Sequence, residues 1–275
     1  MHKTAWLIGA SLASAAAIAQ VAPNQTTYEI VSSGVERSYL LHVPAGYDGE
    51  AVPLVLDFHG SGGVPENQSA TSNFGTIADR EGFAVVFPAG VFTNSGTARS
   101  WNANVEGGVD DVQFARDIID DVAERLSLDR SRVYTTGFSG GARMSSRLAC
   151  QLSHLLAAAA PVAGLQYPDD CTPRQPIPIL AIHGKADRVN QYELSENSRP
   201  YWRMGVETAV EKWRDANSCE TRSDATRFAD DVDRRTWADC SADSEIAFYV
   251  IEDSGHVWPD FASEVIWEFF SRHRL

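Results

Sequence analysis

The stretch "TTGFSGGARM", Thr135–Met144, places one serine between glycines that lie two positions to either side. It follows the β-branched run "VYTT" and precedes a helical pattern, so Ser139 is expected at a sharp turn from a strand into a helix. Such a turn strains the backbone of Ser139, and side chains at Gly137 or Gly141 would clash. The helix N-terminus would then offer amide groups to a negative charge beside Ser139. The alternative is a serine that only caps the helix.

A serine hydroxyl becomes an effective nucleophile only when an imidazole removes its proton and a carboxylate orients that imidazole. Asp187 follows the apolar strand pattern "IPILAIHG", and His256 follows the pattern "IAFYVIEDSG". Both therefore come after later strands, in the order serine, acid, histidine that this type of turn requires. The sequence predicts Ser139, Asp187 and His256 as nucleophile, orienting acid and general base.

Other acids and histidines compete for these roles. Asp169 and Asp170 come before the strand that carries Asp187, and Asp253 is too close to His256 in sequence to reach its ring easily, although a local hydrogen bond stays open. His183 is expected to be packed or bonded to the backbone at its strand end. For His256 itself the alternative is a histidine in a surface loop.

The glycine-rich stretch "HGSGG", His59–Gly63, follows the strand pattern "PLVLDF". Glycines allow such a loop to turn its amide groups inward, and an oxyanion hole needs one amide from this loop and one from the residue after the nucleophile. The main-chain amides of Ser61 and Gly140 are the predicted donors, and His59 is expected to brace the loop. A phosphate-binding loop is the competing interpretation, but neither G-x-x-x-x-G-K-[ST] nor G-x-G-x-x-G is present.

Apolar β-rich runs alternate with amphipathic stretches along the chain, which predicts an α/β protein with a mostly parallel central sheet and helices on both faces. No repeat or linker divides the chain, so residues 20–275 are expected to form one domain. The polar segment from Asn217 to Ser244 follows neither period and is expected to be a surface excursion. The expected strands are "TTYEIVS", "RSYLLHVP" (an antiparallel opening pair), "PLVLDFHG", "FAVVFPAG", "VYTTGFSG", "AAAAPVAG", "IPILAIHG" and "IAFYVIEDSG"; the expected helices are "DVQFARDIIDDVAERL", "GARMSSRLACQL", "VETAVEKWRDA" and "FASEVIWEFFSRH".

The N-terminus has the pattern of a targeting segment. His2 and Lys3 precede an apolar run from Ala5, and Ala17 and Ala19 provide an A-x-A cleavage site, which predicts a signal peptide over residues 1–19 and a secreted protein. A membrane helix is the alternative, but the run is short for a bilayer. The formal net charge of −14 argues against nucleic acid or an anionic membrane surface as a partner.

The four cysteines are expected to form disulfides, because an even number in an exported chain is typical of a disulfide framework. No spacing of cysteine and histidine suits zinc, and no metal site is predicted. Three pairings are possible. Neighbours in sequence close two short loops, which favours Cys150 with Cys171 and Cys219 with Cys240, while the crossed pairings stay open.

These motifs together resemble the secreted feruloyl esterase, acetylxylan esterase and polyhydroxybutyrate depolymerase group of the α/β-hydrolases. The resemblance covers nearly the whole mature chain, and it implies the α/β-hydrolase fold, the triad positions Ser139, Asp187 and His256, bridged cysteines and no cofactor. The motifs that carry it are "HGSGG", "WN" (Trp101-Asn102), "VDDVQF" (Val109–Phe114), "VYTTGFSGGARM", "PVAG" (Pro161–Gly164), "IHGKADRV" and "GHVWP".

Departures from the family pattern concern the edges of the site. Asn190 and Gln191 stand where the segment after the acid often carries valine and proline, and Asp260 follows "GHVWP" where glycine is frequent. Both changes are expected to alter the rim of the site. Trp258 and Trp101 could form aromatic walls for a phenolic acyl group or be core residues, and His59 is a further candidate for substrate contact.

The expected function is hydrolysis of carboxylic esters, with feruloyl or acetyl esters of plant cell-wall polysaccharide first and hydroxybutyrate polyesters as the alternative. A serine peptidase and a non-catalytic binding protein of the same fold are the rival functions. The chain is expected to be monomeric. Asn24 and Asn67 lie in N-x-S/T sequences that could accept glycans.

Overall fold

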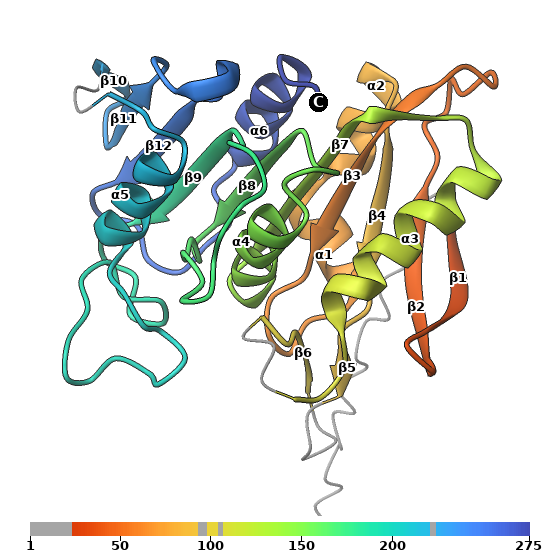
Figure 1. Cartoon of the computed structure of the whole chain (residues 1–275), viewed down its shortest axis with the longest axis horizontal. Coiled ribbons are helices and arrows are strands. Elements are labelled where there is room, and N and C mark those ends of the chain that lie inside the picture. The colour runs from red at the N-terminus through yellow and green to blue at the C-terminus, as the bar shows by residue number, and fades with distance from the viewer. Residues whose placement is uncertain (1–23, 93–97, 104–106, 221–223) are drawn as a thin grey trace, which may run out of the picture.

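The structure, a computed structural model, describes residues 24–92, 98–103, 107–220 and 224–275. The expected signal peptide, residues 1–19, lies outside the described residues. Within them, a large twisted sheet is covered by helices on both faces, as the sequence predicts (Figure 1). None of the helices in these ranges combines the length and the apolar character needed to cross a membrane.

The main sheet of the described residues has ten strands in the order β1-β2-β4-β3-β7-β8-β9-β12-β11-β10. Its centre, from β4 to β12, is parallel, and an antiparallel pair extends it at each edge. The strands are β1 Gln25–Ser32, β2 Val35–His42, β3 Val52–Phe58, β4 Ala84–Pro88, β7 Leu128–Phe138, β8 Ala158–Val162, β9 Ile179–Gly184, β10 Asp224–Ala229, β11 Val232–Trp237 and β12 Ile246–Ile251, with a separate pair β5 Val91–Phe92 and β6 Arg99–Ser100.

The central strands are buried along their length, which explains why they stand out as continuous apolar runs in the sequence. Alternate side chains of β3 enter opposite cores: Leu54 and Leu56 face one, and Val55 faces the other. The sheet therefore separates two hydrophobic cores, and each needs its own layer of helices.

In the described part of the chain, three helices cover each face. In Figure 1, α3, α4 and α5 lie in front of the sheet and α1, α2 and α6 lie behind it. Met144 and Leu148 of α4 belong to the front core, and Ile266 and Phe270 of α6 belong to the rear one. The helices are α1 Pro65–Ser72, α2 Phe74–Glu81, α3 Asp111–Arg125, α4 Gly140–Gln151, α5 Val206–Ala216 and α6 Ala262–Ser271, with a short 3₁₀ helix at Ser241–Asp243.

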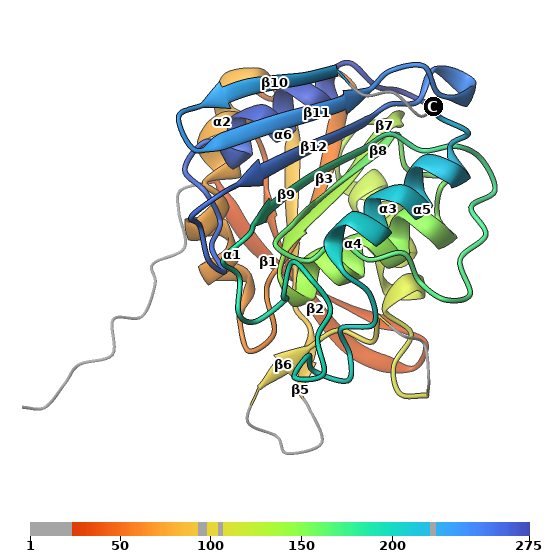
Figure 2. The same cartoon turned by 90° about the vertical axis from the view of Figure 1, so that its left-hand side faces the viewer.

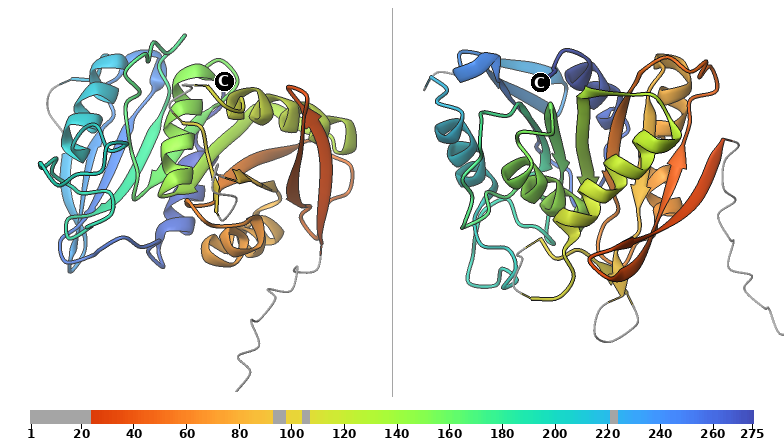
Figure 3. Two further views of the ribbon diagram at one scale, coloured as in Figure 1. Left: turned by 90° about the horizontal axis from the view of Figure 1, so that it is seen from below. Right: turned by 45° about the vertical axis from the view of Figure 1, so that its right-hand side comes forward.

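The β1–β2 hairpin forms one edge of the molecule (Figure 3, right). Its strands are antiparallel, as expected for the opening pair. The helix α3 packs against it, and the guanidinium of Arg125 lies 4.0 Å from the centre of the Tyr28 ring. The front face of this hairpin is thus covered by α3, and the cation–π contact joins the helix to β1.

The expectation of an irregular excursion between Asn217 and Ser244 is wrong. The segment contains β10 and β11, which continue the sheet beyond β12 (Figure 2). The helices α1 and α2 were also not expected from the sequence. In α1 the buried residues are Pro65, Gln68 and Ser72, so the apolar period that usually marks a helix is missing.

Both expected disulfides are present. Cys150 at the end of α4 is bonded to Cys171, and Cys219 after α5 is bonded to Cys240 after β11. The second bridge joins the two ends of the segment that contains the β10–β11 hairpin. The first ties the helix that begins beside Ser139 to the loop after β8.

Candidate functional site

Ser139 occupies the turn between β7 and α4 with φ 55° and ψ −109°, a strained conformation for a residue with a side chain. A Cβ atom at Gly141 would overlap the carbonyl group of Phe58, and one at Gly137 would lie 2.6 Å from the same oxygen. The Ser139 amide donates to the carbonyl oxygen of Val162, 3.0 Å away on β8. The turn is therefore sharp and tightly enclosed, as the glycine spacing predicts.

A row of hydrogen bonds leads away from Ser139. Its Oγ lies 2.8 Å from Nε2 of His256, and Nδ1 of the same ring lies 2.7 Å from Oδ2 of Asp187. These distances fit a neutral imidazole that donates from Nδ1 and accepts the hydroxyl proton at Nε2. Ser139 and His256 are 117 positions apart in sequence. The fold brings them together with Asp187 because the carboxyl ends of β7, β9 and β12 lie at one edge of the sheet.

The carboxylate of Asp187 is buried and held by its own loop. Oδ1 accepts hydrogen bonds from the amides of Val189, at 2.7 Å, and Asn190, at 2.9 Å. Burial opposes the charge, but the hydrogen bonds from His183 and His256 outweigh it and lower the pKa of Asp187 below its usual value. Asp187 is thus ionised and fixed in direction, which is what orienting an imidazole requires.

Asn190 lies in the interior, not at the rim of the site as expected. Its side chain is buried and donates to the carbonyl oxygen of Ala163 at 2.7 Å, and its own carbonyl accepts from Nε2 of His183 at 2.8 Å. The amide side chain therefore ties the acid loop to the end of β8. Gln191 is half-buried, and Asp260 is exposed.

The two amides predicted for the oxyanion hole lie side by side. A Cβ atom at Gly140 would lie 2.9 Å from the amide nitrogen of Ser61. Gly140 begins α4, so its amide has no partner within the helix. Next to Ser61 the loop is fixed by hydrogen bonds from Gly62 to the Arg99 carbonyl, 2.7 Å, and from Gly63 to the Gly60 carbonyl, 2.9 Å.

His59 and Trp101 hold this loop from beneath. Nδ1 of His59 donates to the Gly60 carbonyl at 2.7 Å, Nε2 accepts from the Gly90 amide at 3.0 Å, and the Trp101 indole donates to the His59 carbonyl at 2.7 Å. Burial lowers the pKa of His59 to about 4, so the ring is neutral. His59 is 1% exposed and Trp101 9%, which favours bracing over contact with a substrate.

The bracing continues into a buried ion pair that sequence analysis did not identify. The amide of Asn102 donates to Oδ2 of Asp111 at 2.6 Å, and Arg37 donates to Oδ1 of the same carboxylate at 2.7 Å. Arg37 also donates to the Ala89 carbonyl at 3.1 Å. The hydrogen bond between Asn102 and Asp111 thus joins the motifs "WN" and "VDDVQF". Their spacing in the sequence does not reveal this contact.

Trp258 packs away from the row of hydrogen bonds. Its indole donates to Ser263 at 3.1 Å, and its ring meets Phe74 edge to face at 6.3 Å between centres. These contacts favour the core alternative. The aromatic neighbour of His256 is Phe138, whose ring centre lies 4.8 Å from that of the imidazole.

The rival acids are engaged elsewhere. Asp169 pairs with Arg203 and Asp170 with Arg147, each at 2.5 Å, on the wall of a cavity in front of α4. Arg143 lines the same cavity and reaches Ser61 in the glycine-rich loop, a position that the sequence did not suggest. No cluster of three or more potential metal ligands occurs in the part of the chain that the structure describes.

Comparison with solved structures identifies the fold. An acetyl xylan esterase from Aspergillus awamori superposes with a TM-score of 0.67 at 15% identity, over 90% of this chain and 99% of that one. The mostly parallel sheet with helices on both faces is thus the α/β-hydrolase fold, as the sequence resemblance implied. At this identity the likeness concerns the fold alone.

Comparison with known sequences identifies the family. A feruloyl esterase B of Piromyces equi is 28% identical over 87% of this chain, and a bifunctional acetylxylan esterase/xylanase of Neocallimastix patriciarum is 29% identical over 80%. This chain spans 46% and 31% of their respective lengths. The family model of esterase PHB depolymerases matches residues 37–228, more than half of the chain. This chain therefore belongs to the esterase PHB depolymerase family.

Proposed function

We propose that this protein is a secreted serine hydrolase of carboxylic esters that works through an acyl-enzyme. One observation carries the proposal: the unbroken row from Ser139 Oγ through the His256 ring to the Asp187 carboxylate, with hydrogen bonds of 2.8 and 2.7 Å. A serine that only capped α4 would need no such row, and its side chain makes no capping hydrogen bond in this helix. The family membership supports the same reaction class.

In the first step, Ser139 Oγ forms a bond to the ester carbonyl carbon while its proton passes to Nε2 of His256. Asp187 stabilises the imidazolium that results. The carbonyl oxygen becomes an oxyanion, which the amides of Ser61 and Gly140 are placed to bind. The intermediate then breaks its bond to the alcohol, which leaves with the proton from His256.

In the second step, water attacks the acyl-enzyme. His256 takes a proton from that water, and the hydroxide adds to the same carbonyl carbon above the same two amides. Release of the acid returns the proton to Ser139. Every step is served by side chains and amides of this chain, and the proposal requires no metal or organic cofactor.

The substrates proposed first are feruloyl or acetyl esters of plant cell-wall polysaccharide, because the feruloyl and acetylxylan esterases named above resemble this chain over at least 80% of its length. Hydroxybutyrate oligomers are the second candidate, since the family model carries the name of PHB depolymerases. We further propose a signal peptide over residues 1–19, one catalytic domain over 20–275 and a monomeric mature enzyme.

The test is ester hydrolysis by the purified protein and its Ser139→Ala variant on methyl ferulate, acetylated xylan, hydroxybutyrate oligomers and a small activated ester. We expect the variant to lose at least about a thousandfold in kcat, because the acyl-enzyme can no longer form. The preferred ester would identify the substrate class.

A variant of the neighbouring serine, Ser145→Ala, is the matched control, because Ser145 is buried in the same helix and takes no part in the row. Activity that survives in Ser139→Ala would contradict the nucleophile assignment. Efficient cleavage of matched peptide amides would favour a peptidase, and an intact protein that does not react with a fluorophosphonate probe would favour a binding function.

A further inference from the structure

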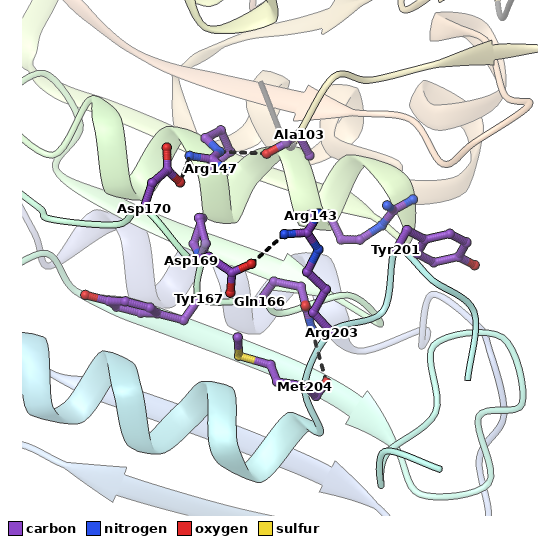
Figure 4. A pocket seen from close by; sticks show the side chains of 11 residues that line it. Ala103, Arg143, Arg147, Gln166, Tyr167, Asp169, Asp170, Tyr201, Arg203 and Met204 are labelled. Atoms are coloured by element: carbon purple, nitrogen blue, oxygen red, sulfur yellow. Dashed lines mark hydrogen bonds and ion pairs between the residues drawn. The ribbon is translucent and has the colours of Figure 1, made fainter. Parts of the chain in front are cut away.

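A cavity of about 330 Å³ lies beside α4, and one of its lining residues, Arg143, reaches Ser61 of the glycine-rich loop. Its wall includes three arginines, two aspartates and two tyrosines (Figure 4). Such a density of charge is unusual for the wall of a pocket that would take only an apolar acyl group.

Two of the arginines have carboxylate partners. Arg147 forms an ion pair with Asp170 at 2.5 Å and donates a hydrogen bond to the Ala103 carbonyl at 2.6 Å. Arg203 is bonded to Asp169 at 2.5 Å. In Figure 4 these pairs occupy the side and the centre of the cavity, so their charges cancel within its wall.

Arg143 differs from both. Its guanidinium lies 4.2 Å from the centre of the Tyr201 ring, and its other polar contact is a long one, 3.4 Å, to Ser61 Oγ. Within the described ranges no carboxylate lies within ion-pair distance of it, and its Nε atom is shielded from solvent without a partner. Burial lowers the pKa of Arg143, but a guanidinium stays protonated, so the cavity wall keeps one unbalanced positive charge.

The position of Arg143 links the cavity to the reaction. It lies one helical turn after Ser139, and it reaches the side chain of Ser61, whose amide is a proposed oxyanion donor. A group held by Arg143 would therefore be attached only a few bonds from the ester carbonyl. In a protein with a net charge of −14, one uncompensated cation at this place favours an anionic ligand.

We propose that Arg143 and Tyr201 form a subsite for a carboxylate carried by the ester substrate. This inference rests on the proposed esterase function and makes it more specific. The carboxylate can belong to the acyl part, as in a half-ester of a dicarboxylic acid, or to the alcohol part, as in an acylated hydroxy acid or an acidic sugar. The guanidinium binds its two oxygens while the ring of Tyr201 keeps the guanidinium in place.

The experiment compares matched esters. On the acyl side, 4-nitrophenyl hemiglutarate is compared with 4-nitrophenyl valerate; on the alcohol side, 3-butyryloxybutyrate is compared with its methyl ester. The wild-type protein is expected to prefer the anionic member of at least one pair, and Arg143→Met is expected to lower kcat/KM for that member roughly 10- to 100-fold, mainly through KM. The pair that responds shows on which side the carboxylate is carried.

Hydrolysis of the neutral member of each pair measures how the substitution of Arg143 affects the reaction apart from binding a carboxylate. Loss of the contact to Ser61 is expected to lower its kcat/KM by no more than about threefold, since 3.4 Å is a weak hydrogen bond. Arg143→Lys should restore part of the preference for the anion, and Arg80→Met, which removes an exposed arginine from α2, should leave the preference unchanged. Equal losses for both members, or no preference in the wild type, would overturn the subsite.

A binding measurement keeps this inference separate from the proposed function. Two pairs are titrated calorimetrically into Ser139→Ala and into Ser139→Ala with Arg143→Met: monomethyl and dimethyl glutarate for the acyl side, and 3-butyryloxybutyrate and its methyl ester for the alcohol side. Tighter binding of the anionic member of either pair that disappears with Arg143 supports the subsite even if no ester is hydrolysed by the wild type. Equal binding of the two members of each pair in both proteins contradicts it, whatever the activity.

Discussion

Arg37 and Arg143 are both arginines with a guanidinium over an aromatic ring, yet their surroundings differ. Arg37 lies 3.8 Å from the centre of the Phe114 ring and is bonded to the buried carboxylate of Asp111. Arg143 lies 4.2 Å from the Tyr201 ring without a carboxylate among the described residues. The first is part of a closed support for the oxyanion loop. Arg143 faces a cavity, where a bound ligand can provide the negative charge that pairs with the guanidinium.

The difference teaches how a buried charge can be interpreted. A charge whose partner is already present in the fold contributes to a unique packing, and removing one member leaves the other uncompensated. A charge without a partner is either neutralised by a shifted pKa or satisfied by something that binds. Arginine cannot take the first course, and Arg143, half-buried in the wall of the cavity, is open to solvent or to a bound ligand.

The largest effect is expected from breaking the closed pair. Arg37→Met leaves the Asp111 carboxylate buried without its cation, which should lower the free energy of unfolding by about 3–5 kcal/mol. Chemical denaturation at neutral pH measures it. Adding Asp111→Asn to the same protein should recover part of the loss, because no buried charge is then left. A single variant as stable as the wild type would show that the pair is not needed.

The next largest effect on stability is expected from a buried acid that has no cation partner among the described residues. Asp57 on β3 is fully buried and accepts a hydrogen bond from Gln68 at 2.8 Å, and burial raises its pKa to about 7. Because the folded state favours the protonated form, this contribution to stability is complete below the unfolded pKa, near 3.8, and is lost as the pH rises towards 7.

The variant Asp57→Asn cannot ionise. Its free energy of unfolding relative to the wild type should therefore rise by about 3 kcal/mol between pH 5 and pH 8, at roughly 1.4 kcal/mol for each unit of pKa shift in that interval. Urea denaturation of both proteins at the two pH values measures the difference. Parallel pH profiles would mean that Asp57 is ionised in the folded protein.

The smallest effect on stability is expected at Arg143. Arg143→Met removes a charge that has no carboxylate partner in the described structure and keeps most of the side-chain volume, so stability should change by less than about 1 kcal/mol. Thermal unfolding of Arg143→Met and Arg37→Met under the same conditions compares the two losses of stability directly. A loss as large as that of Arg37→Met would place Arg143 among the structural residues and remove the reason for a ligand.

The local motifs of the site could be predicted from the sequence because their causes are local. The spacing of Gly137, Ser139 and Gly141 follows from a steric requirement within five residues. The positions of Asp187 and His256 after apolar strands follow from where parallel strands end. The resemblance to known esterases added the family, which the family model then confirmed.

The features that could not be predicted depend on contacts between distant or polar segments. The β10–β11 hairpin is polar and carries arginines such as Arg227 and Arg234, so no apolar alternation marks it. The helix α1 buries Gln68 and Ser72 in place of an apolar stripe. The pairing of Arg143 with Tyr201 joins positions far apart in the sequence, and only the fold shows that they meet.

The backbone of Ser139 has a consequence for how the sequence is maintained over generations. A glycine would adopt φ 55° and ψ −109° without the strain of about 1–3 kcal/mol that a residue with a side chain bears there. In a lineage that ceased to hydrolyse esters, selection for folding alone would favour replacement of the serine. A strained side chain at this turn is therefore expected only in chains where the hydroxyl of Ser139 serves a reaction.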